Sequence, residues 1–187
     1  MRKAKIILTG IFLLVTVRAV AQVDAQYSQY WALPTFYNAA SAGRTDKLNL
    51  LATTRQQWIG MPDAPKTFMV CADMPLRFLN QNHGVGLIFS KETEGLFSNM
   101  VIGAQYAYKL KLWTGTLSLG IQLGMFDQKF DGTKVSIPSD DYHNSNDDAI
   151  PTTEMQKMVF DMGFGVFYNH KYFYAGLSAN HLNEPTV

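Results

Sequence analysis

The chain has 187 residues, with 16 Lys and Arg against 15 Asp and Glu, so no basic excess indicates a nucleic-acid partner. Its single cysteine, Cys71, excludes an internal disulfide, and its place in an expected strand favours a small buried residue over a reactive thiol. After residue 21 no apolar run approaches the roughly 20 residues that a helical membrane span requires. This excludes helical membrane proteins but not β-rich ones.

Residues 1–21 have the three parts of a secretory signal peptide. A basic start, MRKAK, precedes the apolar run IILTGIFLLVTV and a small-x-small site at Ala19 and Ala21. A membrane anchor is the alternative, but Ile6–Val17 is too short for it. We therefore expect export from the cytoplasm, with cleavage near Ala21. Cleavage removes four basic residues and no acidic one, which leaves a formal charge of −3.

Residues 22–47 form an N-terminal aromatic segment that is too polar for a membrane span and too irregular for a helix or strand. Its central part, DAQYSQYWALPTFYNAASAG (Asp24–Gly43), carries five aromatic residues among Gln, Asn and Ser. Because Tyr and Trp bury area while their polar ends find partners, we expect these rings to pack against a wall, as a plug or seam.

Residues 48–187 contain seven segments in which apolar side chains alternate with polar or small ones, as in strands with unlike faces. In Thr116–Phe126, five apolar residues from Leu117 to Met125 alternate with Ser, Gly and Gln. Arg55 and Asp73 both fall opposite the apolar face of their segments. The seven segments are Leu48–Trp58, Lys66–Met74, His83–Lys91, Asn99–Leu110, Thr116–Phe126, Phe160–Asn169 and Tyr172–His181.

A soluble β-sandwich also alternates, but three features favour an all-β, antiparallel, up-and-down outer-membrane barrel. Strands of about 9 to 11 residues, apolar faces that end in Trp or Tyr, and connections of alternating length all fit it. Short turns are expected at Pro75–Asn82, Lys111–Thr114 and Asn169–Lys171, and longer loops at Ile59–Pro65, Glu92–Leu96 and Asp127–Met158. Seven strands are too few for a closed barrel, so we expect an incomplete C-terminal wall, or closure by Tyr27–Tyr37 or a second chain.

Eight glycines fall in the phase opposite the apolar residues, so the inner wall has room beside it. Either glycine permits bends in a curved sheet, or something fills the space. The eight are Gly84, Gly86, Gly103, Gly120, Gly124, Gly163, Gly165 and Gly176.

Other constellations are weaker. Four acids in the loop IPSDDYHNSNDDAIP, Asp140, Asp141, Asp147 and Asp148, lack the spacing of an EF-hand, and a solvated loop is favoured. His143, Ser145 and Asp147 have the residue types of a hydrolytic triad, but nothing in one loop orients them. The glycine pairs follow strand alternation rather than a dinucleotide fingerprint. We therefore expect no catalytic, cofactor-binding or metal residues.

The segment Asp24–Gly43 resembles the opening of the PorP/SprF outer-membrane proteins of the type IX secretion system. It departs from them at Ala25 and Ala39, where the family usually has proline. Further matches follow in order: RQQWIG, APKT, GVGL, YAYKL, DMGFGV and YAGLSANHLNEP. The resemblance assigns signature residues, for structure or partner contact, at Gln26, Tyr27, Ser28, Gln29, Tyr30, Tyr37, Asn38, Gly43, Arg55, Gln57, Trp58, Pro65, Thr67, Asp161, Gly163, Gly176, Leu177, Ser178 and His181.

The resemblance implies a non-enzymatic outer-membrane component, without cofactor, that supports export or surface attachment of client proteins such as gliding adhesins. Implied partners are the periplasmic ring lipoprotein and its associated proteins, and clients with a C-terminal sorting domain. Family members usually continue after the His-Leu-Asn-x-Pro segment, so this chain resembles a truncated or partial member. The alternatives are a porin or small-molecule channel, whose wall here lacks a charged selectivity filter, and an outer-membrane enzyme.

Overall fold

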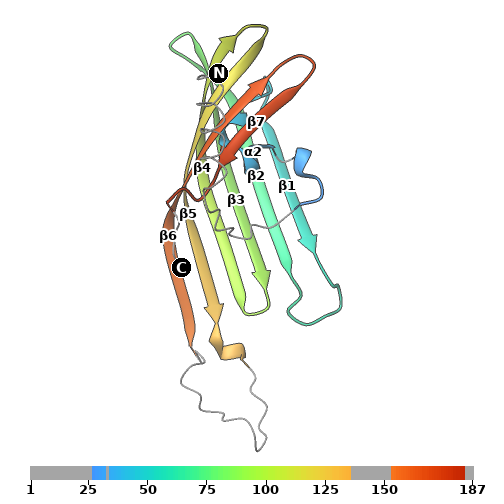
Figure 1. Ribbon diagram of the computed structural model, residues 1–187. Helices are drawn as coiled ribbons and strands as arrows, with labels where there is room; N and C mark the ends of the chain where they lie inside the picture. The colour runs from blue at the N-terminus through green and yellow to red at the C-terminus, as the bar shows by residue number, and fades with distance from the viewer. Residues whose placement is uncertain (1–26, 33, 136–152, 184–187) are drawn as a thin grey trace, which may run out of the picture.

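The computed structural model describes residues 27–32, 34–135 and 153–183, and they form one curled antiparallel sheet (Figure 1). The seven strands pair in chain order, each with the next. They are β1 (Asn49–Gln56), β2 (Lys66–Phe78), β3 (Gln81–Glu94), β4 (Phe97–Leu112), β5 (Gly115–Asp131), β6 (Glu154–Asn169) and β7 (Tyr174–Ala179). The helical pieces are short: η1 (Tyr30–Ala32), α2 (Pro34–Tyr37), η2 (Ala39–Ser41) and η3 (Gly132–Lys134). This half-barrel confirms the predicted all-β, up-and-down fold.

The two faces of the sheet differ as the alternation predicted. On the outer face, side chains that meet across the strands are apolar: one such row is Leu50, Ala72, Leu87, Ala104, Leu123 and Met162. The apolar residues of β5 from Leu117 to Met125 span roughly 27 Å along the strand at about 3.4 Å per residue. Strands of outer-membrane barrels tilt by about 35–45°, so this length covers a height of roughly 19–22 Å, which is most of the apolar band of about 25 Å that such barrels carry.

The inner face is polar or small in the same register. One row across β1 to β6 is Asn49, Asp73, Gly86, Gln105, Gln122 and Gly163. The next row, here called the small-residue row, consists of Gly84, Ala107, Gly120, Gly165 and Ser178. Because residues two apart on a strand share a face, the two rows lie side by side.

The strands are longer than the alternation indicated. Strands β3 to β6 have 14 to 17 residues, against the expected 9 to 11. The expected loop Glu92–Leu96 is a two-residue turn at Gly95 and Leu96, so connections do not alternate strictly in length. The reason is that backbone pairing continues past the apolar band, where polar side chains replace the alternation that marked the strands.

The ends of the sheet also correct the sequence analysis. Strand β7 stops at Ala179 rather than reaching His181, which has a positive φ of 55° and turns the chain. Residues Tyr27–Tyr37 do not complete the barrel wall; their described part is helical or turn-like and lies against the sheet (Figure 1). Within the described ranges, no helix has the length and apolar character to cross a membrane.

A charge placed in the middle of the apolar outer row should test the bilayer-facing assignment. We expect Leu123→Lys to destabilise the membrane-embedded protein by about 2–4 kcal/mol, because an ammonium group near the bilayer midplane loses its hydration. Ser98→Lys, on the same face beyond the apolar band, should cost less than about 1 kcal/mol. The measurement is reversible unfolding from vesicles in denaturant, and equal costs for both variants would contradict the assignment.

Candidate functional site

The candidate site is the inner face, where the N-terminal segment crosses the strands. Residues Asn38–Gly43, here called the crossing segment, contact β3, β4, β5 and β6 through η2. The approach is so close that side chains are excluded beneath it. A Cβ atom at Gly84 would lie 1.9 Å from the Ala42 carbonyl oxygen, and one at Gly120 would lie 2.1 Å from the Ala40 nitrogen. The glycines of the small-residue row therefore leave the space that the crossing segment fills.

Asn38 fixes the crossing segment to the far side of the sheet. Its side-chain Nδ2 donates to the carbonyl oxygens of Val166, at 3.1 Å, and Leu177, at 3.2 Å, which belong to the paired strands β6 and β7. Its Oδ1 accepts from the Ala40 backbone nitrogen at 2.9 Å and so caps η2. One amide thus satisfies three backbone groups.

Asp73, on β2, fixes the other end. This buried carboxylate accepts from the Gly43 nitrogen at 2.8 Å, the Thr35 hydroxyl at 3.2 Å and the Asn49 amide at 3.1 Å. Lys109 of β4 donates to the Gly43 carbonyl oxygen. A buried charge is tolerated because hydrogen bonds replace its hydration.

Two glutamines of the polar row extend the network around Asp73 across β4 and β5. Gln105 Nε2 donates to the Thr35 carbonyl oxygen at 2.8 Å and to Gln122 Oε1 at 2.7 Å. Both glutamines are buried. The polar inner row therefore serves the crossing segment rather than lining open water.

The aromatic residues of the segment lie elsewhere than expected. Tyr27, Phe36 and Tyr37 pack around the buried cluster of Met69, Cys71 and Ile88, not on the glycines. Tyr30 and Trp31 are 63% and 60% exposed. The segment does lie against the glycine wall, as predicted, but with its small residues, because only a thin backbone fits there. Cys71 is buried, as the sequence indicated.

A cavity of about 530 Å³ lies between the segment and the last two strands. Rings of Tyr27, Tyr30, Trp31 and Tyr37 line it together with β7 residues that include Gly176 and Ser178. The Arg44 guanidinium lies 5.6 Å from the Tyr174 ring centroid and 6.0 Å from that of Phe167. Burial raises the pKa of the Tyr27 phenol.

The other signature residues form two further groups. Asp161, fully buried on β6, pairs with His181 Nδ1 at 2.9 Å. Asn183 beside it accepts from the Met162 nitrogen at 3.2 Å, so the turn after β7 covers the edge of β6.

At the opposite end of the sheet, Gln57 donates its backbone N–H to the Pro65 carbonyl oxygen, and the Thr67 hydroxyl donates to Glu92. Arg55 and Trp58 belong to this distant group, Gly163 lies on the polar row, and Leu177 faces outward at 81% exposure.

The remaining candidate residues lie outside the described part of the chain or away from the crossing segment. Gln26 and the loop residues Asp140, Asp141, His143, Ser145, Asp147 and Asp148 lie outside the described residues. Ser28 and Gln29 are exposed in a turn. In the described part of the chain, no group of three or more His, Cys, Asp or Glu residues could hold a metal ion. Five further residues of the site were not predicted. Asn49, Gln105, Lys109 and Gln122 carry only the signal of a polar side chain in the inward phase of a strand, and Thr35, in α2, carries no such signal.

A single methyl group on the small-residue row should displace the crossing segment. We expect Gly120→Ala to cost about 1–3 kcal/mol, because backbone atoms that cannot move aside occupy the position of the new Cβ. Gly103→Ala is the matched control, since its Cβ would meet the Ile88 side chain at 3.0 Å rather than backbone. Unfolding in denaturant and protease cleavage before residue 48 measure the effect. Similar results for both variants would show that close backbone approach is not the cause.

The two functions of Asn38 can be separated by substitution. Asn38→Ala should cost about 1–3 kcal/mol, since it leaves two part-buried carbonyl groups and the Ala40 nitrogen without their partner. Asn38→Asp keeps the acceptor for the Ala40 nitrogen but places an anion against the two strand carbonyls, so we expect at least the same loss. An Asp variant as stable as the original, measured by unfolding at pH 7, would show that donation to β6 and β7 contributes nothing.

Comparison with protein families gives one match. A family model described as type IX secretion system membrane protein PorP/SprF matches residues 19–187, which is nearly the whole chain. Comparisons with curated proteins and with solved structures give no match.

Proposed function

The chain belongs to the PorP/SprF family of type IX secretion system membrane proteins, and on this premise we propose that it is a non-enzymatic outer-membrane component that supports export or surface attachment of client proteins. Gliding adhesins and other proteins with a C-terminal sorting domain are the proposed clients. The periplasmic ring lipoprotein and its associated proteins are the proposed partners.

The apolar outer face supports the outer-membrane placement. Its cross-strand rows are apolar over most of the height of a bilayer core, and a signal peptide would direct the chain through the inner membrane. The turns β2–β3, β4–β5 and β6–β7 lie together at one end of the sheet (Figure 1). We assign this end to the periplasm and the end with the β5–β6 connection to the exterior.

One observation carries the proposal: the inner face is occupied by the chain's own crossing segment. A porin would need this polar wall to line water, yet Asp73 and Lys109 hydrogen-bond Gly43 of the segment, and Gln105 hydrogen-bonds Thr35 just before it. A filled inner face disfavours the diffusion channel. It suits a protein that acts through its surfaces.

The N-terminal segment itself offers such a surface. Asn38 and Gly43 are held against the sheet, whereas Tyr30 and Trp31, whose ring centroids lie 5.5 Å apart, face solvent from the same segment. Exposed Tyr and Trp are the residues that anchor protein interfaces. We propose that this ring pair contacts a periplasmic partner while the crossing segment fixes its position.

Deletion and complementation in the native bacterium test the function. We expect loss of the client from the cell surface on deletion of the gene, restored by the original chain. The double variant Tyr30→Ser with Trp31→Ser should fail to restore it at a normal protein level, because it removes the partner contact but not the fold. Tyr172→Ser, at another exposed ring, should restore it.

Normal client display after deletion would contradict the role in secretion. Planar-bilayer recording of the purified full chain addresses the channel alternative separately, and the filled inner face predicts no steady open-channel current.

A further inference from the structure

Three lysines, Lys66, Lys91 and Lys129, here called the belt, lie on the outer face directly beyond the apolar band, at the end assigned to the exterior. The register places the last mixed row at Phe68, Lys91, Met100, Asp127 and Met158, and the row beyond it at Lys66, Thr93, Ser98, Lys129 and Gln156. These two rows replace the continuous apolar rows nearer the middle of the sheet. The lysines therefore lie at the depth where lipid headgroups begin.

The belt surrounds a cavity. This hollow of about 390 Å³ is lined by residues that include four lysines, Lys66, Lys91, Lys129 and Lys134, and two acids, Asp63 and Asp131. Its rim is held by backbone hydrogen bonds: the Gly95 nitrogen donates to the Asp63 carbonyl oxygen at 3.1 Å, and the Asp131 nitrogen to that of Leu96 at 2.9 Å. These bonds tie the β1–β2 connection, the β3–β4 turn and the end of β5 into one rim.

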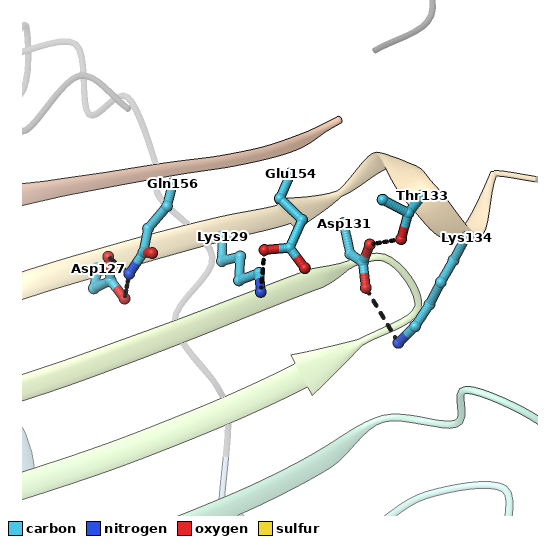
Figure 2. Close-up of polar contacts among 7 residues, drawn as sticks. All are labelled: Asp127, Lys129, Asp131, Thr133, Lys134, Glu154 and Gln156. Carbon is cyan, nitrogen blue, oxygen red and sulfur yellow. Dashed lines mark hydrogen bonds and ion pairs between the residues drawn. The ribbon is translucent and has the colours of Figure 1, made fainter. Parts of the chain in front are cut away.

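The acids beside the belt are already engaged (Figure 2). Glu154 pairs with Lys129 at 2.8 Å, and Asp131 with Lys134 at 3.4 Å. The Asp127 carboxylate is buried and accepts from the Gln156 amide at 3.0 and 2.8 Å. In the part of the chain that the structure describes, the ammonium groups of Lys66 and Lys91 have no carboxylate within ion-pair distance, and both side chains are exposed. The cavity lining thus carries four lysines against two acids, Asp63 and Asp131, and so presents an excess of positive charge on the membrane side.

We propose that this cavity binds the phosphate groups of an outer-leaflet glycolipid of the lipid A type. Lysine stems can lie along the apolar face while the ammonium groups reach the headgroups, and each lysine near an anionic surface adds attraction for it. Phe68, 47% exposed, and Met158, 51% exposed, lie beside the belt, where acyl chains would pass. Several cations around one cavity suit a headgroup with two phosphates better than a lipid with one.

The inference rests on the proposed orientation in the outer membrane, but not on the role in secretion. It is tested on the purified full chain in detergent micelles, with bisphosphorylated lipid A as the probe and phosphatidylglycerol as the single-phosphate comparison. The variant is Lys66→Gln with Lys91→Gln. The matched control is Lys47→Gln with Lys171→Gln, which removes the same charge outside the belt.

We expect the belt variant to bind lipid A roughly 30-fold more weakly, from two lysine contributions of ordinary size, while the control variant binds within about twofold of the original. Microscale thermophoresis measures the affinities, and an unchanged heat-dependent gel shift verifies folding. Equal losses in both variants, or no loss in either, would overturn the site. If the belt variant lost affinity for phosphatidylglycerol by the same factor as for lipid A, the assignment to a glycolipid would be overturned. Client display in cells remains a separate readout, so each proposal can fail alone.

Discussion

The fold depends on the contact between a bare stretch of backbone and a row of glycines. A sheet with ordinary side chains on its inner face would keep any crossing chain several ångströms away, and the space would fill with water. Here Gly84, Gly120 and Gly165 leave no Cβ atoms beneath Asn38–Gly43. The segment therefore lies on the strands themselves, where buried backbone groups must find partners or cost free energy.

Those partners explain why the inner face is polar where it is. Asn38 donates to carbonyl groups of β6 and β7, Asp73 accepts from the Gly43 nitrogen, and Lys109 donates to the Gly43 carbonyl oxygen. The buried Asp73 carboxylate and the half-buried Lys109 ammonium are each bound to Gly43, so the two charges lie close together without an ion pair between them. Glycine supplies the space and three polar side chains supply the hydrogen bonds; neither alone would hold the segment.

The sequence predicted the strands, their faces and the eight inward glycines, because the two-residue alternation of side chains depends only on neighbours along the chain and not on which strands pair. It could not predict which glycines lie side by side, since a row across strands depends on register, which turns and pairing decide. For this reason the segment was placed against the glycine wall correctly but with the wrong residues. The rings are predicted there for their area, yet the atoms nearest the glycines belong to the backbone of Ala39, Ala40 and Ala42 and to the Asn38 amide. The strand ends were not predicted, because backbone pairing between strands continues beyond the apolar band that marks the strands in the sequence.

The two faces of the sheet also differ in what they offer to other molecules. The crossing segment covers the small-residue row of the inner face, so the surfaces available to other molecules are the cavity beside the segment, the rims and the outer face. Beside the cavity, the exposed rings of the N-terminal segment are held in place by residues that are themselves buried. At the end assigned to the exterior, charges appear on the outer face only after the last apolar row, because a lysine one row earlier would lose its hydration in the bilayer core. The recognition chemistry therefore lies where the packed inner face and the apolar outer face leave aromatic or charged groups exposed.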